Sequence, residues 1–88
     1  MTWARRVDAN HTEIGDALRG CGFLVLDLAG FGRNVPDYLV KFGGFWSFVE
    51  VKRPKGKLRA GQRAFSELWP VVVVQTVDEV IALRQRIV

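Results

Sequence analysis

Hydrophobic residues recur with a helical period near the start of the chain. Ile14 and Leu18 would share one helix face, so the pattern predicts a helix from about Asp8 to Arg19. Asn10 stands three residues before Glu13, the spacing of a capping box, which makes Asn10 a candidate N-cap. Two glycines close behind this segment end the predicted helix.

Three predicted strands follow, and two of them are joined by a short turn. Phe23–Leu28 is mostly apolar, so we expect it to be largely buried. Asp37–Phe42 and Phe45–Lys52 flank Gly43–Gly44, a dipeptide that favours a two-residue hairpin turn because both positions tolerate positive φ. The pattern therefore predicts a strand, a loop and a β-hairpin.

The last third of the chain alternates helix, strand and helix. A helix is predicted over Arg59–Trp69, and Pro70 ends it. Val71–Gln75 is apolar on both faces, which predicts a central strand. Thr76 and Glu79 have capping-box spacing and begin the final helix. The predicted order α-β-β-β-α-β-α belongs to the α/β class, with a mixed central sheet flanked by helices.

Length and composition bound the class of protein. Residues 1–88 suffice for one domain, and 49% hydrophobic with 25% charged residues excludes a disordered chain. Apolar runs such as Val71–Val74 are far shorter than the roughly 20 residues that cross a bilayer, and no stretch of signal-peptide length follows Met1. We therefore expect a cytoplasmic protein without a membrane partner. Cys21 and His11, each the only residue of its kind, leave no zinc site built from His and Cys.

Positive charge is concentrated in one segment. The chain carries 13 Lys and Arg against 9 Asp and Glu, a formal net charge of +4. Six of these cations lie within twelve residues that contain no acid: Lys52, Arg53, Lys55, Lys57, Arg59 and Arg63. Such a cluster is typical of a surface that binds a polyanion, and a solvated loop and helix face explains it equally well.

The hairpin register places two acids together. With a two-residue glycine turn, Phe42 faces Phe45 and Asp37 faces Glu50. Two carboxylates directly opposite each other repel unless a cation lies between them. Lys52 projects from the same face as Glu50, so the sequence indicates a site for Mg²⁺ or Mn²⁺, which prefer oxygen ligands. Alternatively, Asp37 only begins a strand, and Glu50 and Lys52 face solvent; a three-residue turn would also shift the register.

These residues resemble a known nuclease motif. Pro36–Asp37 followed by Glu50–Lys52 resembles the PD-(D/E)XK motif, and the element order is similar to the core of that superfamily. Glu50–Arg63, a Glu-Val-Lys strand followed by a basic loop and a helix that carries Gln62, resembles the virus-type replication-repair nuclease (VRR-NUC) family. The resemblance covers roughly residues 12–75 and implies a restriction-endonuclease-like fold.

The resemblance also implies a metal site. Asp37, Glu50 and the Val51 carbonyl would bind Mg²⁺, for which Mn²⁺ would substitute. Glu13 matches the helix-borne acid that helps complete the family's metal site. The alternative for Glu13 is a role only in the capping box.

Further roles follow from the same resemblance. Lys52 would orient the attacking water or offset charge on the pentavalent phosphate, and Gln62 would lie beside the catalytic residues. Gln62 could also be an ordinary exposed helix residue, and for His11 a surface or capping role is favoured over contact with a phosphate. The expected DNA-binding residues are Lys55, Lys57, Arg59 and Arg63.

The expected function is that of a single VRR-NUC-like nuclease domain of phage type, spanning residues 1–88. It would be a Mg²⁺-dependent, structure-specific DNA endonuclease that acts on branched DNA such as Holliday junctions. We expect a homodimer, because Phe42, Phe45 and Trp46 would otherwise be wet at the hairpin tip. The alternatives are a non-catalytic DNA-binding module on a nuclease-like fold and an RNA-directed nuclease.

Overall fold

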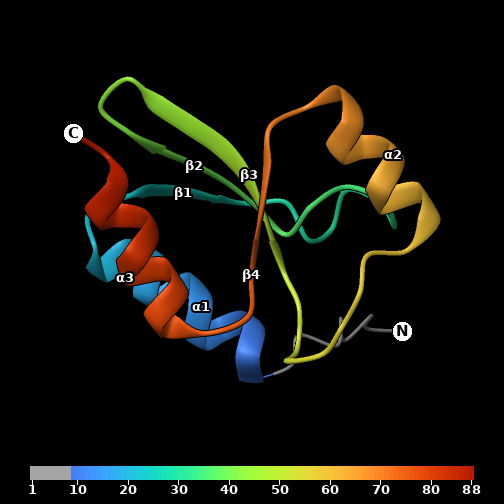
Figure 1. Ribbon diagram of the computed structural model, residues 1–88, viewed down its shortest axis with the longest axis horizontal. Coiled ribbons are helices and arrows are strands. Elements are labelled where there is room, and N and C mark those ends of the chain that lie inside the picture. Colours follow the sequence, from blue (N-terminus) through green and yellow to red (C-terminus); the bar gives the residue numbers. More distant parts are fainter. Residues whose placement is uncertain (1–8) are drawn as a thin grey trace.

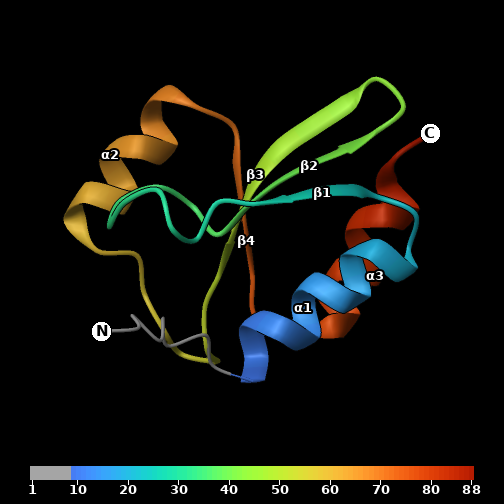
Figure 2. The ribbon, with the colours of Figure 1, turned by 180° about the vertical axis from the view of Figure 1, so that it is seen from behind.

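Two helices cover one face of a mixed four-stranded sheet, and a third helix lies on the opposite face (Figure 1; Figure 2). The computed structural model describes residues 9–88, so Asp8, the predicted start of the first helix, lies outside the described residues. The elements are α1 (Ala9–Gly20), β1 (Leu24–Asp27), β2 (Tyr38–Phe42), β3 (Phe45–Val51), α2 (Ala60–Leu68), β4 (Val71–Val74) and α3 (Val77–Arg86). The predicted α/β class, element order and mixed sheet are confirmed.

The sheet is built on the predicted hairpin. Its strand order is β1-β2-β3-β4, antiparallel up to β3 and parallel between β3 and β4. Phe42 pairs with Phe45 as expected, and Gly43 has a φ of 58°, the left-handed conformation for which a glycine is favoured. Asp37, one residue before the paired segment, therefore stands opposite Glu50.

The hydrophobic core lies between the sheet and the pair of helices α1 and α3. Alternate residues of the strands point to this face, as the period of an extended chain requires. The fully enclosed aliphatic side chains, each with 0% exposed surface, are Ile14, Leu18, Val40, Val49, Val74 and Val80. Burying one such side chain contributes about 1.5–3 kcal/mol, so this layer fixes α1 against the sheet.

Two strands that were expected in the interior lie at the edges of the sheet. β4, predicted to be central, is an edge strand, and Val73 is 38% exposed. The stretch Phe23–Leu28, predicted to be largely buried, forms the other edge, where Leu24 and Leu26 are 70% and 56% exposed. β4 lies at an edge because only β3 pairs with it, and β1 is exposed because the second face of the sheet is covered over β3 but not over β1.

Aromatic rings attach α2 to that second face. Phe65 and Trp69 contact Phe48 of β3 edge-on, with ring centroids 5.0 and 6.2 Å apart. Leu68, by contrast, is 80% exposed. The one buried residue of α2 is polar, since Gln62 is only 6% exposed. A buried amide is costly unless it is hydrogen-bonded, so this position must be explained by its partners.

The hairpin tip is less exposed than the sequence suggested. Phe42 and Phe45 pack against Phe23, with centroids 5.9 and 6.4 Å apart, and the Arg84 guanidinium lies 3.7 Å from the centre of the Phe42 ring. Only Trp46 of the three expected aromatic residues is exposed, at 47%. The prediction of a wet aromatic cluster is therefore wrong for two residues, because the C-terminal part of α3 and the residue before β1 cover them.

One of the two predicted caps is present. Thr76 Oγ1 accepts from the Glu79 N–H at 3.2 Å, and Glu79 Oε1 accepts from the Thr76 N–H at 3.1 Å, which forms the capping box of α3. Asn10, the candidate N-cap of the first helix, lies within α1 instead. Its side-chain amide donates to the Lys52 carbonyl at 3.2 Å and ties α1 to the end of β3.

Over residues 9–88 the helices are too short, or not apolar enough, to cross a membrane.

Candidate functional site

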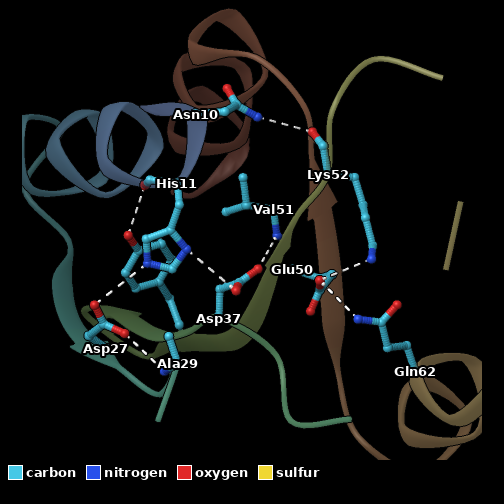
Figure 3. Close-up of polar contacts among 10 residues, drawn as sticks. Asn10, His11, Asp27, Ala29, Asp37, Glu50, Val51, Lys52 and Gln62 are labelled. Carbon is cyan, nitrogen blue, oxygen red and sulfur yellow. Dashed lines mark hydrogen bonds and ion pairs between the residues drawn. The ribbon is translucent and has the colours of Figure 1, made fainter. Parts of the chain in front are cut away.

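Two acidic side chains meet where β2 begins and β3 ends (Figure 3). Asp37 directly precedes β2, and its carbonyl accepts a hydrogen bond of 2.8 Å from the Leu28 N–H. Its Oδ2 accepts another of 2.8 Å from the Val51 N–H. These backbone bonds hold Asp37 beside Glu50, the second-last residue of β3. The structure thus brings together the two carboxylates that the register predicted.

Glu50 is buried but has polar partners. Its side chain is 7% exposed, and its Oε2 lies 3.4 Å from Lys52 Nζ. The same oxygen accepts a hydrogen bond of 3.2 Å from Gln62 Nε2. At the other end of that amide, Gln62 Oε1 accepts from the Arg59 N–H at 2.9 Å. Both ends of the buried Gln62 amide are therefore used, which explains its position and orients its NH₂ group toward Glu50.

The surroundings of Glu50 disfavour its charge. Burial first, and the negative charge of Asp37 second, raise the pKa of Glu50 from its ordinary value of 4.5 to about 7. The Lys52 ammonium lowers this pKa but does not cancel the increase. A divalent cation between the two carboxylates would restore the ionised form, because a nearby opposite charge favours ionisation.

These groups line an open polar cleft. Its volume is about 260 Å³, and its lining residues are Ala29, Gly32, Arg33, Val35, Asp37, Glu50, Val51, Lys52, Arg59 and Gln62. A larger cavity of about 570 Å³ lies between the sheet and the end of α3. Its lining is mostly apolar, and no acidic residue is among the described residues that form it. The chemistry of the smaller cleft makes it the better candidate for an active site.

The cleft suits a hard divalent cation in the type of its donors. Asp37 and Glu50 offer carboxylate oxygens, and Val51 belongs to the same lining. Such all-oxygen sets are typical of Mg²⁺ and Mn²⁺. Within residues 9–88, no group of three His, Cys, Asp or Glu side chains is placed to hold a metal. A metal here would therefore need backbone and water oxygens besides the two carboxylates, as the expected Val51 carbonyl ligand implies.

The structure does not bring Glu13 into this cleft. Glu13 is exposed and is not among the lining residues. The inward face of α1 carries His11, Ile14 and Leu18, all buried, and Glu13 lies about 100° around the helix from Ile14. The phase of α1 is fixed by its apolar residues, and that phase turns Glu13 outward.

The four expected DNA-binding residues lie on the β3–α2 side of the cleft. Lys55 and Lys57 are exposed in the connecting loop, where the Gly56 N–H donates to the Arg53 carbonyl at 2.8 Å and closes a turn. Arg59 lines the cleft, and Arg63 donates to the Leu58 carbonyl at 2.8 Å. In the described part of the chain none of the four forms an ion pair with an acid. Their charge therefore faces solvent, and Arg59 is the one of the four that lines the cleft.

Two residues near the site, Asp27 and Arg33, were not predicted, and the surface role favoured for His11 is wrong. His11 is buried, with Asp27 on one side and Asp37 on the other, and Arg33 lines the cleft. His11 had one signal in the sequence, because it stands three residues before Ile14 and so shares its helix face. The only signal for Arg33 was that it is the one charged residue in a loop rich in glycine. Asp27 had no signal beyond its position at the end of a predicted strand.

Comparisons of the chain with protein-family models, with curated proteins and with solved structures found no match in any of the three.

Proposed function

We propose that this protein is a Mg²⁺-dependent DNA endonuclease with a PD-(D/E)XK-type core, similar to the VRR-NUC family. One observation carries the proposal: the buried Glu50 is held by Lys52 and Gln62 opposite Asp37, in an open cleft with cations at its margin. A purely structural role would not require an acid at 5% exposure beside a second acid. Clusters of this kind, with a raised pKa in a cleft, are typical of active sites.

The chain's own groups have distinct tasks in phosphodiester hydrolysis. A bound Mg²⁺ would supply a Lewis acid and lower the pKa of water. Asp37 and Glu50 would hold that ion, and Gln62 keeps the Glu50 carboxylate in place. Lys52, whose side chain is 14% exposed, places a positive charge at the cleft where negative charge develops on the phosphate.

The charge around the cleft favours a polyanionic substrate, and we propose DNA. Arg33, Arg59 and Lys52 line the cleft, and Lys55 and Lys57 are exposed in the loop that joins Lys52 to Arg59. Branched DNA such as a Holliday junction remains the proposed preferred form. The homodimer also stays a prediction, now supported by the exposed Trp46 together with Leu24 and Leu26 on the uncovered sheet face.

Incubation of the protein with supercoiled plasmid and with a synthetic four-way junction tests the proposal. Nicking in Mg²⁺ or Mn²⁺ that EDTA abolishes supports an endonuclease, and faster cutting of the junction than of a linear duplex supports structure specificity. Binding of DNA without cleavage in either metal would show a DNA-binding module instead of an endonuclease. Cleavage of an RNA strand in preference to DNA would overturn the substrate assignment.

Replacement of Lys52 should slow chemistry without preventing metal binding. Lys52→Met keeps most of the aliphatic stem but removes the charge that faces the reacting phosphate. We expect turnover at saturating Mn²⁺ to fall by about 100-fold, the usual effect of losing one electrostatic contact to a transition state. Calorimetric titration with Mn²⁺ should still show binding. Lys41→Met, at the exposed position of β2, is the matched control, and wild-type turnover in Lys52→Met would exclude this role.

The basic loop should determine how DNA affinity depends on salt. If Lys55 and Lys57 each contact a phosphate, the double variant Lys55→Gln/Lys57→Gln should flatten the plot of log affinity against log salt by about 1.8, since each contact contributes about 0.9. Affinity is measured in Ca²⁺ or in a cleavage-deficient background. The variant Lys41→Gln/Arg86→Gln removes the same charge from positions outside the cleft lining. Equal slopes of log affinity against log salt in the two double variants would show that Lys55 and Lys57 do not contact phosphates specifically.

A further inference from the structure

His11 lies between two acidic side chains near the start of α1 (Figure 3). Its Nδ1 is 3.4 Å from Asp37 Oδ1, and its Nε2 is 3.6 Å from Asp27 Oδ2. The residue is only 7% exposed. The imidazole therefore connects Asp37, a proposed metal ligand, with Asp27 at the end of β1. Asp27 does not line the cleft.

The imidazole is held firmly in this position. Its ring lies on the Tyr38 ring with centroids 4.6 Å apart, and the Tyr38 hydroxyl donates to the His11 carbonyl at 2.9 Å. Gly15 leaves the room for that hydroxyl, because a Cβ at this position would collide with it. On the far side, Asp27 Oδ1 accepts from the Ala29 N–H at 2.9 Å. Tyr38 thus holds both the ring and the backbone of His11, and a local bond to the Ala29 N–H fixes the Asp27 carboxylate.

The arrangement orients Asp37 from two directions. Its Oδ2 accepts from the Val51 N–H at 2.8 Å, and its Oδ1 faces His11. A carboxylate has about four lone-pair positions, so two contacts fix its plane and leave positions for a cation. His11 itself is poorly placed to share one ion with both acids, because its two nitrogens face opposite ways.

We propose that His11 is a positioning residue, anchored by Asp27, that holds the Asp37 carboxylate in the orientation required for divalent-metal binding. This inference rests on the proposed function, since it assumes that Asp37 is a metal ligand. Outer-shell partners of this type orient ligands in other metal sites, and their loss typically weakens metal affinity or activity by about 10- to 100-fold.

The test compares metal binding with turnover. His11→Ala should raise the Mn²⁺ concentration for half-maximal binding in calorimetry by about 10- to 100-fold. It should raise the Mg²⁺ requirement for plasmid nicking in parallel, and saturating metal should restore most of the turnover. Asp27→Asn, at a half-exposed side chain, should move both measurements in the same direction by less. His11→Gln keeps one donor and should lie between wild type and His11→Ala.

Two controls separate positioning from general loss of stability. Ile14→Val on the same helix face removes one buried methyl, and should lower the melting temperature without changing the metal midpoint. Thr12→Ala is the second control, at an exposed neutral residue next to His11. Unchanged metal midpoints in both His11→Ala and Asp27→Asn would overturn the inference while wild-type binding and nicking still support the proposed function. A wild-type protein that neither binds Mn²⁺ nor cleaves would overturn both.

Discussion

Glu50→Gln should reduce metal-dependent DNA cleavage by more than about 100-fold while the domain stays folded. Loss of an outer-shell partner alone costs about 10- to 100-fold, so loss of a ligand itself should exceed that range. Glutamine keeps the size of the side chain and an oxygen that can accept from Gln62. Plasmid nicking in Mg²⁺ and calorimetric titration with Mn²⁺ measure the effect, and circular dichroism shows whether the fold is intact.

Asp37→Asn should behave in the same way, because it leaves an acceptor for the Val51 N–H but removes the second negative charge. Glu67→Gln is the matched control, since it changes an exposed acid of α2. Cleavage by Glu50→Gln at a rate close to that of Glu67→Gln would show that the paired carboxylates do not hold the catalytic metal.

Short-range rules predicted the part of the fold that holds the two acids. A two-residue glycine turn fixes the pairing of its strands, so Asp37 could be placed opposite Glu50 before any tertiary structure was known. The edge position of Val71–Val74 could not be found in this way. An apolar strand is compatible with a central position, and whether a second strand pairs with it depends on contacts between distant segments.

The same limit applies to the candidate site. Glu50, Lys52 and Gln62 lie within thirteen residues, so strand alternation and one helix turn bring them together. The directions in which Glu13 and His11 point depend on how α1 is rotated about its axis against the sheet. Burial of Ile14 and Leu18 sets that rotation, and it turns His11 inward and Glu13 outward. The resemblance assigned Glu13 to the metal site, whereas the helical period of Ile14 and Leu18 is the feature that places His11 on the buried face.

The stability of the metal-free protein should fall as pH rises from about 4.5 to about 8. The folded state raises the pKa of Glu50 to about 7, whereas the unfolded chain restores the ordinary value of 4.5. Between these values the folded state holds the proton more tightly, so the free energy of unfolding declines with increasing pH and levels off above the folded pKa. A shift of this size corresponds to about 3 kcal/mol, at 1.36 kcal/mol for each pKa unit.

Urea unfolding in EDTA at a series of pH values measures this slope. Glu50→Gln should remove most of it and should be more stable than wild type at pH 8, whereas Glu67→Gln should follow wild type because its side chain is exposed. Mg²⁺ should stabilise wild type more at pH 8 than at pH 6, since the ion competes with the proton for the Glu50 carboxylate and binds only the folded pair. Parallel pH curves for Glu50→Gln and wild type in EDTA would show that Glu50 does not bear the electrostatic cost of the carboxylate pair.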